Sequence, residues 1–172
     1  MWFIKRKVWL AVASVLCVLA GLRYWQVNAN PLCRGVDKEI FVKKGQEVHA
    51  PGIDFKILSA KMVKEKENVY LTVKVDLKDR GYYADGKRGI IAAVNNMYFN
   101  MPYSLSNPSD LDVVDGKGHK MAIGYLTSKT PQPLTLKFDN VRSWYDTENA
   151  PARFSFLVGD GNGYKKYSMP LE

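Results

Sequence analysis

Apolar and polar residues alternate one by one in the most regular stretch of the chain, residues 68–77. Its sequence is NVYLTVKVDL, in which every second residue from Val69 to Leu77 is aliphatic. Successive side chains of a strand point to opposite faces, so a period of two predicts a β-strand with one buried face. Residues 53–62 repeat the pattern, but the apolar phase shifts after Ile57. One extra residue in the strand, a β-bulge, would explain that shift.

Shorter stretches of the same kind predict further strands, at residues 39–43, 89–94, 111–114, 120–123, 133–138, 153–158 and 164–169. Turn-forming residues separate them, among them Asp85-Gly86, Asp115-Gly116 and the glycine-rich run 159–163. No helical stripe stands out after residue 27, and residues 95–109 are expected to form a loop. Many short strands with such turns predict an all-β fold, an antiparallel immunoglobulin-like β-sandwich preceded by one N-terminal hydrophobic helix.

A continuous apolar segment precedes the strands. Residues 8–22 carry no charge and follow Lys5, Arg6 and Lys7. A basic flank before an apolar stretch holds the amino end in the cytoplasm, so we expect the rest of the chain outside. Fifteen helical residues span about 22 Å, less than the roughly 30 Å of a bilayer core, but aromatic and basic flanks extend the membrane contact to residues 8–27.

Two readings of this segment stay open. It is either a signal anchor that stays in the membrane or a signal peptide cleaved near Ala29, where Val27 and Ala29 form an acceptable peptidase site. The expected organisation is a signal anchor or signal peptide at residues 1–29, a tether at 30–37 and one extracytoplasmic domain at 38–172. The protein is therefore expected at the cell membrane, single-pass with its C-terminal domain outside, or secreted after cleavage.

The formal charge of +8 does not by itself indicate a nucleic-acid partner. Residues 1–29 contain four bases and no acid, which leaves 21 bases against 17 acids in the remainder. That excess of four fits an ordinary solvated surface, or contact with an anionic wall polymer or lipid surface. We expect no nucleic-acid partner.

Cysteine and histidine usage argues against a disulfide framework and a zinc site. Only Cys33 lies beyond the apolar segment, so no bridge can form within the outer domain; Cys33 is a free thiol or an intermolecular link. Neither His49 nor His119 has a second ligand at a useful spacing. The loop from Asp110 to Asp115 is similar to a calcium loop, but its twelfth position is Met121. A hairpin turn is the preferred reading, with partial calcium coordination left open.

Motifs of catalysis are not found. There is no G-x-S-x-G elbow, and the GDGNG run precedes a predicted strand, not a helix whose amino end could hold a phosphate. We expect no enzyme, no catalytic residue, no cofactor and no metal site.

Aromatic residues near predicted loops provide a candidate binding surface. Tyrosine and tryptophan combine an apolar ring with a polar edge, which favours them where a protein meets a partner. The alternative is that the rings plug the ends of the sandwich. The candidates, centred on a binding edge at residues 80–103, are Tyr82, Tyr83, Lys87, Arg88, Tyr98, Phe99, Tyr103, Trp144 and Tyr145.

Four elements together carry a family resemblance. They are the entry Gly45-Gln46-Glu47-Val48, the strand at 69–77, the hairpin at 115–120, and the strand at 154–158 before Gly159-Asp160. Over residues 39–171 the chain resembles exported immunoglobulin-like domains of unknown function on membrane-anchored or secreted proteins of Gram-positive bacteria. It departs from them in its aromatic-rich loop at residues 78–107.

The export segment, the aromatic residues near loops and the lack of a catalytic motif together predict a non-catalytic binding or interaction module at the cell envelope. Its expected partner is another envelope protein, and the alternative is an anionic cell-wall polymer or a carbohydrate. No catalytic residue is known for that family, so none is carried over.

Overall fold

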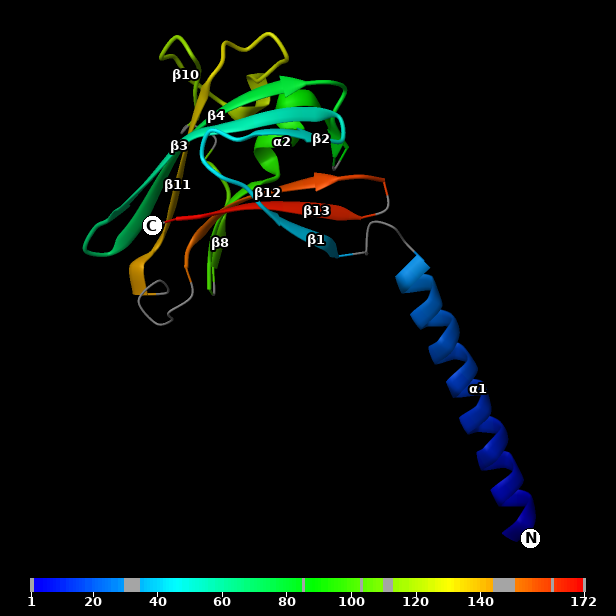
Figure 1. Cartoon of the computed structure of the whole chain (residues 1–172). Helices are drawn as coiled ribbons and strands as arrows, with labels where there is room; N and C mark the ends of the chain where they lie inside the picture. Colours follow the sequence, from blue (N-terminus) through cyan, green and yellow to red (C-terminus); the bar gives the residue numbers. More distant parts are fainter. Residues whose placement is uncertain are drawn as a thin grey trace.

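The computed structural model describes residues 2–29, 35–84, 86–102, 104–109, 113–143, 151–161 and 163–171. The first element is the helix α1 (Trp2–Ala29), which extends away from the strands (Figure 1). Within α1, side chains are described for Trp9 and residues 12–25, and these are exposed. Among the residues with described side chains, no helix has the length and apolarity needed to cross a membrane.

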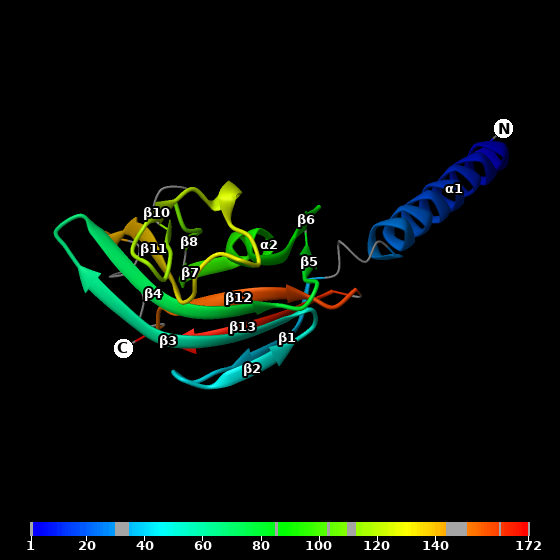
Figure 2. The same ribbon diagram turned by 90° about the horizontal axis from the view of Figure 1, so that it is seen from above.

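Two β-sheets form the body of the molecule (Figure 2). Sheet A contains, in spatial order, β1 (Val36–Phe41), β13 (Tyr164–Pro170), β12 (Arg153–Gly159), β7 (Met97–Met101) and β8 (Ser104–Ser106). Sheet B contains β10 (Lys120–Met121), β9 (Val113–Val114), β11 (Leu134–Val141), β4 (Asn68–Asp79), β3 (Ile53–Lys64) and β2 (Glu47–Ala50). Neighbouring strands of the two sheets are antiparallel except β1 and β13, which run parallel. The fold is an all-β sandwich, as predicted.

The β3–β4 hairpin is the longest paired segment and follows the sequence pattern closely. Val69, Leu71, Val73 and Val75 are all fully buried, while the side chains between them face outward. The register with β4 shifts between Ile57 and Ser59 of β3. This shift confirms the predicted bulge, which keeps both halves of β3 facing the core.

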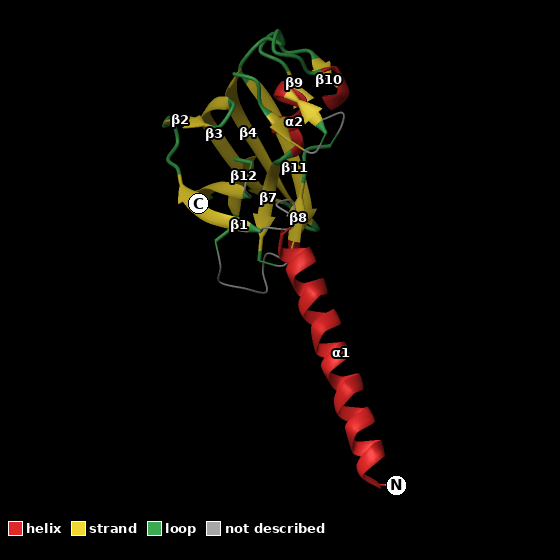
Figure 3. Cartoon of the chain, turned by 90° about the vertical axis from the view of Figure 1, so that its right-hand side faces the viewer, coloured by secondary structure: helices red, strands yellow, loops and turns green. Residues whose placement is uncertain are grey.

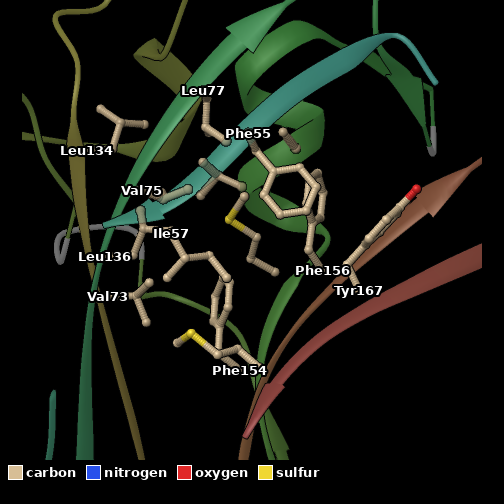
Figure 4. Packing of buried hydrophobic residues seen from close by; sticks show 14 of the residues in the cluster. Phe55, Ile57, Val73, Val75, Leu77, Leu134, Leu136, Phe154, Phe156 and Tyr167 are labelled. Atoms are coloured by element: carbon tan, nitrogen blue, oxygen red, sulfur yellow. The ribbon is translucent and has the colours of Figure 1, made fainter. Parts of the chain in front are cut away.

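Aromatic rings from both sheets meet in the core (Figure 4). Phe55 of β3 packs edge-on against Phe156 of β12 and Tyr167 of β13, with ring centroids 5.1 and 5.3 Å apart. Phe138 of β11 contacts Phe154 of β12 in the same geometry, at 5.9 Å. Such pairs contribute about 0.5–1.5 kcal/mol beyond the burial of their area. These cross-sheet contacts hold the two layers together.

Residues 89–94, predicted as a strand, form a helix. α2 (Gly89–Asn95) is buried at Gly89, Ile90, Ala92, Ala93 and Val94, and it contacts β4. The isoleucines and the valine favoured a strand, but the segment packs against β4, the β5–β6 hairpin and η2 and pairs with no described strand. Buried backbone groups need hydrogen-bond partners, and a helix supplies them within the segment. A buried segment without a strand partner therefore forms a helix despite its local β preference.

Two other segments also differ from the prediction. Residues 95–109, expected as a loop, contain β7 and β8, because Met97, Phe99 and Met101 alternate as buried residues with Tyr98 and Asn100. The strand expected at residues 120–123 ends at Met121 and continues into the 3₁₀ turn η2 (Ile123–Tyr125).

Candidate interaction surface

A small hairpin lies between the end of β4 and the start of α2 and contains much of the predicted binding edge. Its strands are β5 (Tyr83–Ala84) and β6 (Lys87–Arg88). Asp79, the last residue of β4, accepts hydrogen bonds at Oδ1 from the backbone N–H groups of Gly81 (2.9 Å) and Tyr82 (3.0 Å). The N–H of Gly89 donates to the carbonyl of Tyr82 at 2.7 Å, which closes the hairpin. The hairpin is therefore fixed at both ends.

The two adjacent tyrosines of this hairpin lie in opposite environments. Tyr82 is only 2% exposed; its ring packs against Phe156 and its hydroxyl donates to the carbonyl of Leu157 at 3.2 Å. Tyr83 is 59% exposed, and the guanidinium carbon of Arg88 lies 6.0 Å from its ring centroid. Since neighbouring side chains in extended backbone point to opposite sides, burial of Tyr82 presents Tyr83 to solvent.

A hollow of about 370 Å³ opens beside the exposed tyrosine. Its walls are Asp79, Gly81, Tyr82, Tyr83, Arg88 and Gly89. The rim thus combines an aromatic ring, a guanidinium and a carboxylate with backbone. Such a hollow is at the small end of ligand-sized sites, so it suits a protruding side chain of a partner better than a whole ligand.

The structure brings three of the nine predicted binding residues together. Tyr83, Lys87 and Arg88 are exposed on the hairpin. Tyr82 and Phe99 are buried, which corrects their assignment to an exposed binding surface: Phe99 packs in the core, and Tyr82 supports the hairpin and forms part of the wall of the hollow. Tyr98 is half-buried on the outward face of sheet A. Three predicted residues lie outside the described part of the chain, namely Tyr103, Trp144 and Tyr145.

Sequence reasoning missed a polar array on the outward face of sheet A. Glu39 of β1 accepts a hydrogen bond from the hydroxyl of Ser168 at 2.7 Å and forms ion pairs with Arg153 (3.1 Å) and Lys166 (3.2 Å). The Arg153 guanidinium also lies 5.3 Å from the ring centroid of exposed Phe41. The Ser168 hydroxyl chiefly, with the two cations, lowers the pKa of Glu39 although burial opposes this. No local motif marks this array, because it joins three separate strands.

In the loop from Asp110 to Asp115, the described residue Asp115 forms the hydrogen bonds of a turn, the preferred reading of the sequence. Oδ1 of Asp115 accepts hydrogen bonds from the backbone N–H groups of Lys117 (2.9 Å) and His119 (2.8 Å). Burial would raise the pKa of Asp115, but these donors outweigh it and lower the pKa. Asp115 therefore stabilises the turn between β9 and β10. Within the described residues no group of three or more potential metal ligands occurs, and Asp110 and Asp112 lie outside that part of the chain.

The other histidine, His49, belongs to a cluster that supports the fold. Oδ1 of buried Asp54 lies 2.9 Å from Nδ1 of His49 and 2.8 Å from Nη2 of Arg80. Arg80 also donates to the carbonyl of Ala50 at 3.1 Å. These contacts fasten the β2–β3 turn to the end of β4, directly before the hairpin.

Comparison with known proteins identifies no family. No family model matches the chain, and no curated protein matches it. Among solved structures, an uncharacterized β-sandwich protein from Clostridium difficile 630 aligns with 17% sequence identity and a TM-score of 0.47. The alignment covers 81% of this chain and 97% of that one.

Proposed function

We propose that this protein is a non-catalytic interaction module of a bacterial cell envelope, placed outside the membrane by its N-terminal segment. In this proposal it recognises another envelope protein through the β5–β6 hairpin. The observation that carries the proposal is the exposed Tyr83, paired with Arg88 at the rim of the hollow beside Asp79.

The composition and rigidity of the hairpin support recognition of a protein. Tyrosine and arginine are enriched among the residues that dominate binding energy in protein interfaces. Asp79 and buried Tyr82 fix the hairpin backbone, and the Arg88 guanidinium lies beside the exposed ring of Tyr83. A surface ordered before binding loses less conformational entropy when the partner arrives.

Its polar groups favour binding over catalysis. Asp79, the carboxylate of the hollow, already accepts two backbone hydrogen bonds. Its contacts are those of a residue that holds a turn, and the neighbouring side chains in the wall are tyrosines and an arginine.

The proposal that the protein is exported depends on the sequence of the first 29 residues. Lys5, Arg6 and Lys7 precede the apolar stretch, and α1 runs continuously through it to Ala29. At about 1.5 Å per residue, the 28 residues of α1 extend over roughly 42 Å. Tyr24 and Trp25, both exposed, follow the apolar stretch, where aromatic rings favour the headgroup level. Both an anchor and a peptide cleaved near Ala29 are compatible with this proposal.

An immunoglobulin-like subtype belongs to the same proposal. Two facing sheets, between which the chain crosses from β4 to β7 and again from β11 to β12, support it. The run of three consecutive strands, β2, β3 and β4, in one sheet departs from the A-B-E-D order of immunoglobulin constant domains.

Site-specific photo-crosslinking from the hairpin tests this function. The full-length chain would carry a photoreactive residue in place of Lys87, an exposed residue of β6, and would be expressed in its own cells. We expect a discrete adduct with one envelope protein, lost in the Tyr83→Ala and Arg88→Ala variants. Tyr125→Ala is the matched control, because Tyr125 is a tyrosine 77% exposed in the η2 turn. An adduct that persists in both hairpin variants would remove the hairpin as the site.

A further inference from the structure

The outward face of sheet B carries lysines in two adjacent rows across three strands. In one row Lys61 of β3 and Lys137 of β11 both pair with Thr72 of β4. In the next row Lys74 of β4 pairs with Thr135 of β11. Figure 3 shows these strands side by side. We call Lys61, Lys74 and Lys137, with the two threonines, the lysine face.

The spacing of the strands fixes the size of this group. Neighbouring strands lie about 4.8 Å apart, and residues two apart on one strand about 6.8 Å. The Cα atoms of Lys61 and Lys137 are therefore about 10 Å apart, and that of Lys74 lies about 8 Å from each. Lysine side chains are long and flexible, so the three ammonium groups can converge above the threonine hydroxyls or separate along the surface.

These three lysines are not neutralised within the described part of the chain. Each is exposed, and no described carboxylate lies within 4.0 Å of its ammonium group. The nearest acidic positions on the face are Asp139, which pairs with Tyr70, and Asp76, which pairs with Lys56; they occupy the flanking rows. The positive charge at the centre of the face is thus available to an anion.

We propose that the lysine face binds a flexible polymer that carries closely spaced phosphate groups. A phosphate presents several acceptor oxygens, and ammonium and hydroxyl donors approach it from different directions. The three lysines are exposed on neighbouring central strands of sheet B, so the face suits an extended chain that contacts several lysines in turn. This activity is separate from the hairpin, which lies beyond the end of β4 at Asp79.

The test uses the full-length chain in a neutral detergent and long-chain sodium polyphosphate as the probe. The lysine-face variant carries Lys61→Glu, Lys74→Glu and Lys137→Glu. The matched control carries Lys43→Glu, Lys44→Glu and Lys129→Glu, three exposed lysines in loops, so both variants change the net charge equally. Binding is measured by fluorescence anisotropy at several salt concentrations, and circular dichroism with thermal melting verifies that each variant folds. The Lys→Gln versions provide the second set if a glutamate variant does not fold.

We expect wild type and control to bind alike and the lysine-face variant to bind about tenfold more weakly at low salt. The slope of log K against log salt should fall by about two, as loss of three lysine contacts predicts for a flexible single strand. An equal loss of affinity in both triple variants, or no loss in either, would refute the assignment to this face. Equal affinity for poly-L-glutamate of matched length would refute phosphate specificity. If the chain binds phosphatidylglycerol vesicles but not polyphosphate, the ligand of this face is a membrane surface and not a polymer.

One further variant separates this inference from the proposed function. The Tyr83→Ala, Arg88→Ala double variant is expected to bind polyphosphate as wild type does. A loss of polyphosphate binding in that variant would place the anion at the hairpin and overturn the lysine face.

Discussion

Gly89 lies so close to the carboxylate of Asp79 that an added β-carbon would force one of them to shift. A β-carbon on Gly89 would stand 2.7 Å from Oδ2 of Asp79, and the backbone of Gly89 has a φ of +67°. The residue that begins α2 is thus packed directly against the residue that ends β4. This contact sets the position of the hairpin between them.

A Gly89→Ala variant should be destabilised for both reasons. The positive φ costs about 1–2 kcal/mol for a residue with a β-carbon, and the contact with Asp79 adds to that cost. Gly86→Ala is the control, since Gly86 has a φ of +75° but no atom within 4 Å of the added carbon. Chemical denaturation should show the larger loss of unfolding free energy for Gly89→Ala. Equal losses would mean that the contact with Asp79 relaxes without cost.

Removal of the hydroxyl should change the stability of the domain at Tyr82 but not at the adjacent Tyr83. Tyr82→Phe leaves the carbonyl of Leu157 without its donor, which should lower the free energy of unfolding by about 1 kcal/mol. Tyr83→Phe should change stability little, because Tyr83 is exposed. Denaturant titration of both variants measures the difference. A larger effect at Tyr83 would contradict the burial described here.

Acid should weaken the array on sheet A through Glu39. The pKa of Glu39 in the folded chain is below its ordinary value of 4.5, chiefly because of the Ser168 hydroxyl. Its stabilising effect is therefore complete above the unfolded pKa and is lost as the pH falls through the lower folded pKa. Glu39→Gln should remove this part of the acid dependence, and Ser168→Ala should remove some of it. Thermal melting between pH 7 and pH 3 checks this; unchanged acid dependence in Glu39→Gln would exclude the array as its source.

Export predicts where the C-terminal end of the chain is found. A reporter enzyme that is active only outside the cytoplasm, fused after residue 172, should be active in cells. Replacement of Lys5, Arg6 and Lys7 by Glu should reduce that activity, because the basic flank sets the orientation. The mass of the recovered chain then distinguishes an anchor from cleavage near Ala29. Reporter activity confined to the cytoplasm would refute export.

Local alternation in the sequence was enough to predict the β3–β4 hairpin and its bulge, because one face of each strand is buried. It was not enough for residues 89–94, where the Gly-Ile-Ile-Ala-Ala-Val stretch fits a buried strand as well as a buried helix. Only the surroundings of this segment in the folded domain decide between a strand and a helix. Met97 and Met101 do alternate with polar neighbours, but the tyrosine and phenylalanine between them obscured the period.

The candidate site was predictable only in part. Composition identified the segment containing Tyr83, Lys87 and Arg88, but it could not tell Tyr83 from buried Tyr82. The choice between them depends on contacts with Phe156 and Leu157, which are more than 70 residues away in the sequence. Likewise, Glu39 and Arg153 are 114 residues apart and meet only through the order of strands in sheet A.

The parallel pairing of β1 with β13 has a consequence for how the domain is made. Val36 pairs with Tyr164 and Phe41 with Ser168, so β1 binds a strand that is synthesised much later. Until residues 164–170 have left the ribosome, β1 lacks its described neighbour in sheet A, whereas β3 and β4 can pair early. The pairing of β1 therefore waits for the seven residues of β13, and a chain truncated before residue 164 would leave β1 without this partner.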